Sequence, residues 1–255
     1  VLVGGLRRGR REMNATRQVA GLAPLERFHG GISEELALVA TFPQLEYPRR
    51  WPAHAHVTGP IEFELPAAEI EVPDGDEPLV LVAPSTAHDP ECRLVRVALE
   101  ALADEPVRVV ATTNRHRPEE PLPTPPANAL VVDWLSYSQL MPLADLAVTH
   151  GGHGTVARAL GAGTPLLCCP AVGDMAENGA RVAWAGAGLM LPWRLTAPTS
   201  VRFAVRRLLT DRAFATSAKA IASSPQAEAG AERSAELVAS LADPSTTKGL
   251  QKQAF

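Results

Sequence analysis

Three short segments of the chain place glycine or polar residues directly after apolar runs, and a fourth junction adds a tryptophan. The most conspicuous is His150-Gly151-Gly152-His153-Gly154-Thr155. Its glycines allow the backbone to bend tightly and to approach a ligand closely. The helical pattern that follows would offer unpaired backbone N–H groups and the positive end of a helix dipole, both of which suit a phosphate. His150 and Thr155 would add two side-chain donors. Taken alone, the segment is equally compatible with two interpretations: a phosphate-binding loop, and a tight turn whose histidines have no role.

A metal site on these histidines is disfavoured. Zinc sites in proteins use three or four side-chain ligands. The sequence offers no third or fourth ligand close to His150 and His153. We therefore expect no metal and no other cofactor.

A second segment, Pro170 to Asn178, carries Asp174 where an apolar run gives way to a helical pattern. The Asp174 carboxylate could accept hydrogen bonds from sugar hydroxyls. Glu177 follows three residues later, and this spacing is also that of a capping box, in which Asp174 would cap the helix. The two roles are compatible because one carboxylate oxygen can cap while the other faces a ligand.

Two further junctions contribute candidate side chains. Ser85 and Thr86 place hydroxyls after the apolar run Leu79 to Ala83, where an ordinary turn is the simpler interpretation. Trp134 and Leu135 follow another apolar run. Trp134 either belongs to the core or stacks on a nucleotide base.

These junctions depend on an alternation of strands and helices from about residue 77 onward. The pattern predicts strands over 79–83, 107–111, 129–132, 146–149 and 165–170, and helices over 90–103, 137–142, 155–161, 174–185, 198–210, 213–223 and 229–241. Such alternation is typical of an α/β fold: a Rossmann-like parallel sheet with helices on both faces. In these sheets ligands bind at the carboxyl ends of the strands, so the candidate loops should lie at one edge.

The first part of the chain reads differently. It predicts one or two helices, a strand over 36–41 and a Pro- and Gly-rich linker with little regular structure over 47–60. We divide the chain into residues 1–65, an α/β domain over 66–242 and a polar tail over 243–255.

Composition limits the classes of protein. The chain has 255 residues, 46% hydrophobic, and a formal net charge of −4, which argues against nucleic-acid binding through bulk charge. The basic run Arg7 to Arg11 fits an exposed helix start. Three cysteines are too few for a disulfide framework, and no apolar run reaches the ~18–20 residues that span a bilayer. We expect a soluble, cytoplasmic protein without a transmembrane segment.

Taken together, the segments resemble one family. The ordered run from Asp133 through Thr155, then Gly163-Thr164-Pro165, Gly173-Asp174 and Asn178 to Val182, is similar to the signature of UDP-glycosyltransferase-like enzymes. These include bacterial macrolide, antibiotic and glycolipid glycosyltransferases. The resemblance covers roughly residues 78–242 and implies the C-terminal half of a GT-B fold.

The resemblance also implies roles for individual residues. The segment holding the nucleotide base would contain Trp134 and Leu135; donors to the diphosphate would be Ser85, Thr86, His150, Gly152, Gly154 and Thr155; and Asp174 would bind the donor sugar. The chain departs from the family twice. Met175 stands where most relatives have Gln, and Ser136-Tyr137 where relatives often have Pro-Gln.

The implied reaction is transfer of a hexose, with inversion, from a UDP- or dTDP-linked sugar to a hydroxyl of a small-molecule or lipid acceptor. Relatives place the acceptor pocket and a general-base histidine in an N-terminal domain. We expect this chain, which opens on Val1, to keep only the end of that domain, through loss of an upstream portion or an unusual start codon. No histidine here is assigned as the base.

Three alternatives stay open: a nucleotide-binding module that works with a separate acceptor subunit, a related enzyme such as a sugar-nucleotide epimerase, and an inactive gene remnant. A homodimer is compatible with the sequence, which does not fix the oligomeric state.

Overall fold

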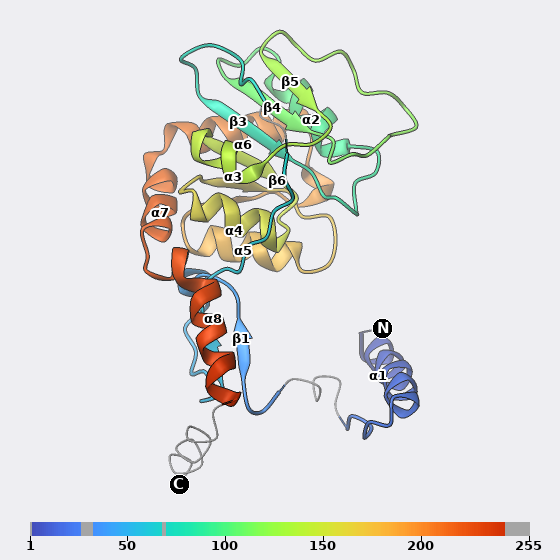
Figure 1. Cartoon of the computed structure of the whole chain (residues 1–255). Helices are drawn as coiled ribbons and strands as arrows, with labels where there is room; N and C mark the ends of the chain where they lie inside the picture. Colours follow the sequence, from blue (N-terminus) through green and yellow to red (C-terminus); the bar gives the residue numbers. More distant parts are fainter. Residues whose placement is uncertain (1, 27–32, 68–69, 243–255) are drawn as a thin grey trace.

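The computed structural model describes residues 2–26, 33–67 and 70–242. Its centre is a six-stranded, wholly parallel sheet in the order β5-β4-β3-β6-β7-β8 (Figure 1). The strands are β3 (Leu79–Ala83), β4 (Arg108–Thr112), β5 (Ala129–Val132), β6 (Leu146–Thr149), β7 (Leu166–Cys168) and β8 (Gly188–Met190). The sheet's first strand lies in the middle and its fourth strand beside it, the order of doubly wound nucleotide-binding folds. The predicted fold class is confirmed.

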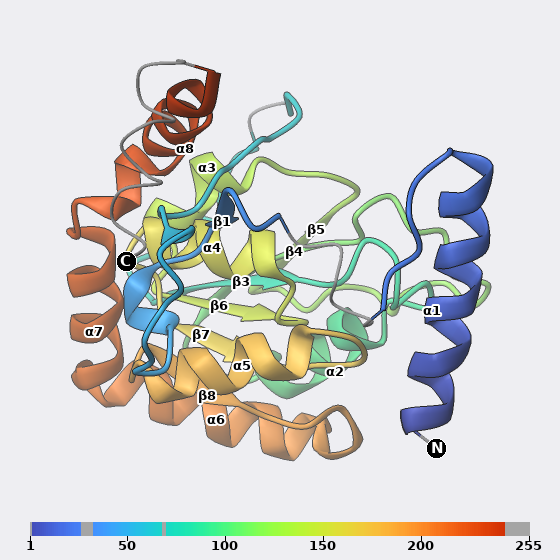
Figure 2. The same ribbon diagram turned by 90° about the horizontal axis from the view of Figure 1, so that it is seen from below.

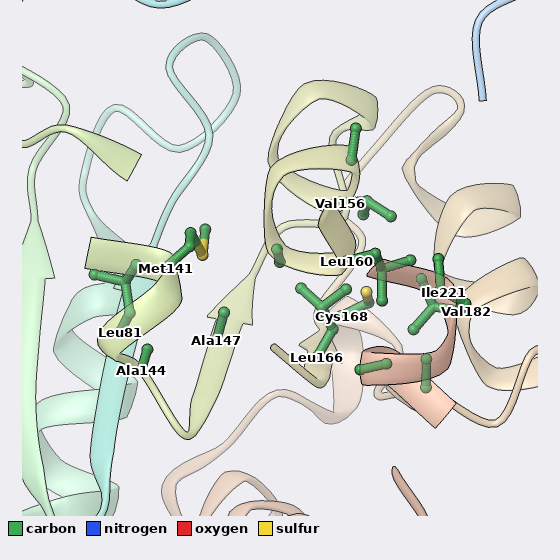
Figure 3. Packing of buried hydrophobic residues seen from close by; sticks show 14 of the residues in the cluster. Leu81, Met141, Ala144, Ala147, Val156, Leu160, Leu166, Cys168, Val182 and Ile221 are labelled. Carbon is green, nitrogen blue, oxygen red and sulfur yellow. The ribbon is translucent and has the colours of Figure 1, made fainter. Parts of the chain in front are cut away.

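Helices cover both faces of the sheet because successive strand residues point to opposite sides. In β3, Leu79 and Leu81 join one apolar cluster, whereas Val80 joins the other. The first cluster, part of which Figure 3 shows, lies under α3 (Tyr137–Leu140), α4 (His153–Gly161), α5 (Met175–Trp184) and α7 (Arg212–Ala222). The second lies under α2 (Arg93–Leu102) and α6 (Pro198–Thr210). Figure 2 shows α4 and α6 on opposite sides of the sheet.

Most boundaries agree with the sequence patterns. The strands over 79–83, 129–132 and 146–149 are found as predicted, while β4 begins one residue late and α4 two residues early. The sixth strand, β8, was missed because it has only three residues and begins with glycine, which is rare in strands. Glycine is required there, since a Cβ on Gly188 would lie 2.1 Å from the Leu166 carbonyl oxygen.

The part of the chain before the sheet contains α1 (Leu2–Val19), β1 (Ala37–Val39), the 3-10 turn η1 (Pro43–Leu45) and β2 (Ala55–Val57). β1 and β2 form a separate parallel pair. The expectation of little regular structure over 47–60 was therefore wrong at β2, a strand too short to leave a pattern. The basic run at Arg7 lies within α1 and not at its start. The polar tail over 243–255 lies outside the described residues, and the domain division at residue 65 stays a prediction.

The remaining elements are two 3-10 turns and the last helix. Two 3-10 turns, η2 (Met141–Leu143) and η3 (Trp193–Leu195), connect elements of the sheet domain. The last helix is α8 (Gln226–Ala242). It crosses the chain after β2 in backbone contact, since a Cβ on Gly230 would lie 2.1 Å from the Pro60 carbonyl oxygen.

Candidate functional site

The loops after β3 and β6 meet at the point where the strand order reverses. These two strands are neighbours in the sheet, and the chain leaves them toward different helices. His150, which follows β6, places its Nδ1 3.3 Å from the carbonyl oxygen of Ala83 at the end of β3. The two loops that the sequence singled out are therefore brought together at the crevice where α/β sheets bind ligands.

His150 is held with a defined ring orientation. Its side chain is only 9% exposed, and burial lowers the pKa of the imidazole, so the free protein holds it neutral. Because a carbonyl oxygen can only accept, the contact with Ala83 assigns the proton to Nδ1. Nε2 then points over the start of α4, where a Cβ on Gly152 would lie only 2.2 Å from it. A glycine at position 152 is thus a condition for this ring position.

The N-terminus of α4 is open to an anion. Gly152 is the N-cap and supplies no side-chain cap, and the first helical hydrogen bond runs from Val156 N to Gly152 O at 3.0 Å. The earlier N–H groups of this turn therefore carry the partial positive charge of the helix end. Thr155, also predicted, is nearly buried in this turn.

The other helix that begins at this crevice, α2, is already neutralised. The buried carboxylate of Asp89 accepts hydrogen bonds from Arg93 N at 2.8 Å and Leu94 N at 2.9 Å. A second negative group at that helix end would meet the carboxylate. Of the two helix starts, α4 is the one that can receive a phosphate.

Ser85 and Thr86 lie at the tip of the β3 loop. Ser85 is buried, and its Oγ accepts hydrogen bonds from Ala87 N at 3.2 Å and His88 N at 3.0 Å, which leaves its proton free to be donated. Thr86 is exposed.

Asp174 does not cap its helix. It occupies the N-cap position of α5, but its φ of −78° and ψ of −10° are already helical, and it makes no side-chain cap hydrogen bond. The capping-box interpretation is wrong because a capping carboxylate needs an extended backbone at that residue. Glu177 instead forms an ion pair with Arg181, with an N–O distance of 2.9 Å. The exposed Asp174 carboxylate is left available for a ligand.

Asn178 connects Asp174 to the loop at Gly151, and the sequence analysis gave it no role in the site. Its Nδ2 donates to the Gly151 carbonyl oxygen at 3.0 Å and to Asp174 Oδ2 at 3.1 Å. Only the fold brings residues 151 and 178 together. The signals in the sequence were its place in the family signature and the spacing of one helical turn between Asp174 and Asn178.

The Trp134 side chain lies beside the turn after β4. The Arg115 guanidinium carbon is 4.4 Å from the centre of the Trp134 ring, a cation–π contact. The indole Nε1 is buried without a hydrogen-bond partner among the described residues. Leu135, by contrast, is 2% exposed and belongs to the core, so only its backbone is available to a ligand.

Metal ligands do not gather at this crevice or elsewhere in the described chain. Among residues 2–26, 33–67 and 70–242, no three His, Cys, Asp or Glu side chains are placed to hold a metal ion. In the same ranges, every helix is too short or too polar to span a bilayer.

Comparison with known proteins decides the family. Residues 96–242, more than half of the chain, match the model of the erythromycin biosynthesis protein CIII-like C-terminal domain. The chain belongs to this glycosyltransferase family. The EryCIII-like domain begins within α2 and continues to the end of α8, so it contains His150, the start of α4 and Asp174.

Individual relatives agree with this assignment. The 4'-demethylrebeccamycin synthase of Lentzea aerocolonigenes is 37% identical over 187 residues, which cover 71% of this chain and 44% of that protein. The crystal structure of the calicheamicin glycosyltransferase CalG4 is 25% identical with a TM-score of 0.71, over 89% of this chain and 57% of that one. The glycosyltransferase VinC in complex with dTDP is 27% identical with a TM-score of 0.60, over 80% and 51%. This chain spans about half the length of the curated relatives it matches.

The two departures from the family pattern have different surroundings in this EryCIII-like domain. Met175, where the family resemblance implies Gln, is 6% exposed, so its side chain is buried and not offered to a ligand. Tyr137 is largely enclosed and donates its hydroxyl proton to Asn114 Oδ1 at 3.2 Å. Tyr137 therefore ties α3 to the turn after β4.

Proposed function

We propose that this chain is the donor-binding half of a glycosyltransferase that moves a hexose, with inversion, from a nucleoside diphosphate sugar to an acceptor hydroxyl. The observation that carries the proposal is the uncapped start of α4 beneath Nε2 of His150, at the switch point of a sheet in a glycosyltransferase family. A diphosphate is the ligand whose charge and oxygen acceptors fit that arrangement.

Each part of the donor has its own group of residues in this proposal. The diphosphate lies at the start of α4, against His150, Gly152, Gly154 and Thr155, with the hydroxyls of Ser85 and Thr86 opposite. The base lies against Trp134 and the backbone of Leu135, and the sugar against Asp174. The base is uracil or thymine, and the dTDP bound to VinC favours thymine. The acceptor is a small molecule or a lipid.

Chemically, the acceptor oxygen attacks the anomeric carbon while the bond from that carbon to the phosphate oxygen breaks. The electron pair of the breaking bond leaves with the nucleoside diphosphate. The N–H groups of α4 and a protonated His150 stabilise that charge without a metal ion. The acceptor proton passes to a general base outside this chain's assigned residues, so we expect the chain alone to transfer sugar poorly.

Calorimetric titration with UDP and dTDP tests the proposal. The wild-type chain should bind at least one of the two, and His150→Ala should bind that nucleotide at least tenfold more weakly. Asp174→Ala should lower the affinity for the corresponding sugar nucleotide more than the affinity for UDP or dTDP itself. His153→Ala is the matched control, because the His153 Nε2 is 2.9 Å from the Ala40 carbonyl oxygen and not over the α4 start. Equal losses in the two histidine variants would refute the site.

A second function, nucleotide binding in service of a separate acceptor subunit, is kept because the chain spans about half of its relatives. Transfer assays with the purified chain separate the two. Rapid, acceptor-specific turnover by the chain alone would exclude the second function. Turnover that appears only on adding another polypeptide would support it.

A further inference from the structure

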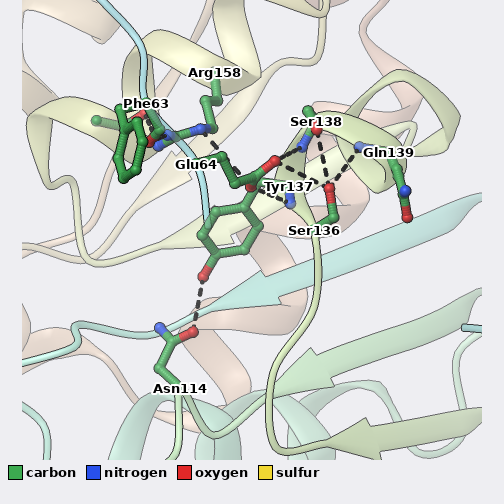
Figure 4. Close-up of polar contacts among 9 residues, drawn as sticks. Phe63, Glu64, Asn114, Ser136, Tyr137, Ser138, Gln139 and Arg158 are labelled. Atoms are coloured by element: carbon green, nitrogen blue, oxygen red, sulfur yellow. Dashed lines mark hydrogen bonds and ion pairs between the residues drawn. The ribbon is translucent and has the colours of Figure 1, made fainter. Parts of the chain in front are cut away.

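An extended segment before the sheet, residues 61–65, runs along α3 and α4 and presents one carboxylate to α3. Glu64 accepts hydrogen bonds from Tyr137 N at 2.7 Å, from Ser138 N at 3.2 Å and from the Ser136 hydroxyl at 3.0 Å (Figure 4). Burial alone would raise the pKa of Glu64, but these hydrogen bonds lower it below its ordinary value. Glu64 is therefore ionised at neutral pH and fully engaged with the start of α3.

The helix that Glu64 caps cannot hold its own shape. α3 has four residues, a single turn, and an isolated turn of helix is unstable without outside contacts. Its own N-cap, Ser136, accepts one hydrogen bond from Gln139 N at 3.3 Å. Glu64 supplies acceptors for the two N–H groups that Ser136 does not reach.

The same segment is tied to the phosphate helix. Arg158 of α4 places its Nε 3.8 Å from Glu64 Oε1, and its guanidinium donates to the Phe63 carbonyl oxygen (Figure 4). Both side chains of the ion pair are mostly buried, with 15% and 19% exposed. Arg158 lies one turn after Gly154 in α4. Glu64 therefore contacts α4, whose start takes part in the proposed site, and α3, which directly follows the segment proposed to hold the base.

A further set of hydrogen bonds connects α3 to the loop after β3, which carries Ser85. The Tyr137 hydroxyl reaches Asn114 Oδ1, and Asn114 Nδ2 donates to the Pro84 carbonyl oxygen at 2.7 Å, next to Ser85. Residues 134 and 135 directly precede the Ser136 that Glu64 binds. Through these contacts Glu64 fixes the position of the base loop, residues 134 and 135, relative to the loops at Ser85 and His150 that are proposed to bind the diphosphate.

We propose that Glu64 is a positioning residue for the donor nucleotide, which fixes the base loop at Trp134 relative to the phosphate-binding start of α4. This inference rests on the proposed function. Its effect should fall on the base and not on the diphosphate, because the N–H groups of α4 and His150 do not contact Glu64. Nucleotide affinity and diphosphate affinity should therefore separate when Glu64 is changed.

The experiment uses the full chain and two ligands: UDP, or dTDP if that binds better, and inorganic diphosphate titrated as its competitor at millimolar concentrations. Glu64→Ala should weaken the nucleotide about tenfold and leave inorganic diphosphate within about twofold. Glu64→Gln keeps one acceptor oxygen and should weaken the nucleotide only about threefold. Glu62→Ala is the matched control, since Glu62 lies in the same segment near Arg158 but makes no hydrogen bond to α3 within the described chain.

Three results would overturn this inference alone. The first is a folded Glu64→Ala protein with wild-type nucleotide affinity. The second is an equal loss for nucleotide and inorganic diphosphate, which would indicate general damage. The third applies if the Glu64→Ala variant does not fold. It is a Glu64→Gln variant whose nucleotide affinity equals that of wild type. A wild-type chain that binds neither ligand overturns the proposed function and this inference with it, whereas the other results leave the proposed function standing.

Discussion

Replacing Gly152 by alanine tests whether the His150 ring position depends on the missing side chain. The backbone of Gly152, with φ −64° and ψ 141°, is one that alanine adopts without strain. The only obstacle is the new methyl group, which would lie 2.2 Å from His150 Nε2 and 3.1 Å from the two neighbouring ring carbons. Van der Waals contact requires ~3.5 Å or more, so the ring must move by about 1 Å.

The magnitude follows from what that movement breaks. Nδ1 has two contacts that are already 3.3 Å long, with the Ala83 carbonyl oxygen and with Thr149 Oγ1, so a shift of this size disrupts the hydrogen bonding of a buried N–H group. An unpaired buried donor costs about 1–3 kcal/mol, and forcing an extra methyl into a packed site costs a similar amount. We expect Gly152→Ala to lower the free energy of unfolding by about 2 kcal/mol and nucleotide affinity about tenfold or more.

Urea denaturation of the single and double variants provides the assay. In a His150→Ala background the methyl group has no ring to meet, so Gly152→Ala should then cost less than about 0.5 kcal/mol. A Gly152→Ala protein as stable as wild type would refute the reasoning. So would a cost that persists in the His150→Ala background, because it would place the conflict elsewhere.

Three further predictions follow from other features. Burial lowers the pKa of His150 in the free protein, whereas bound diphosphate favours the protonated imidazole and raises that pKa. The ratio of wild-type to His150→Ala affinity for UDP should therefore fall as pH rises between the pKa of the free protein and that of the complex. A ratio that calorimetry finds constant over this pH range would exclude the linkage. Asp89→Ala should destabilise the chain by about 2 kcal/mol in urea denaturation because it uncaps α2, whereas the exposed Glu91→Ala should have little effect; equal effects would contradict the capping role. Gly230→Ala should lower the melting temperature although alanine favours helices, because its Cβ would lie 2.1 Å from the Pro60 carbonyl oxygen. Gly161→Ala is the control, since the nearest atom to a Cβ there is 3.8 Å away. A higher melting temperature for Gly230→Ala would refute the close crossing.

The sheet could be predicted from the sequence because its central strands leave a strong pattern. All residues of β3 and β6 are buried, and such strands read as unbroken apolar runs. β2 and β8 leave no such pattern, since each has three residues and pairs with a single neighbour. Each depends on pairing with the preceding strand across an intervening connection, and local sequence does not record that pairing.

The candidate site divides in the same way. His150 and Asp174 stand where a buried strand gives way to a helix, so their positions follow from the alternation of elements. Asn178 and Glu64 escaped prediction because their partners are remote in sequence or lie on another element. The capping box at Asp174 failed for a local reason: residue spacing fixes which atoms are near in an ideal cap, and the actual backbone there is already helical.

The crossing of α8 over the chain after β2 also bears on the order in which the protein folds. Gly59 precedes the whole sheet domain in sequence and Gly230 follows it, yet their backbones touch. On a ribosome, the sheet can assemble from neighbouring β and α units as they emerge, since every strand pairs with the next strand in sequence except at the junction of β3 with β6. The short pair β1 and β2 is followed directly by this crossing, so it cannot gain that contact with α8 until α8 has left the exit tunnel. We therefore expect its two strands to be the last part to become protected against hydrogen exchange during synthesis, and the first to lose protection when α8 is removed.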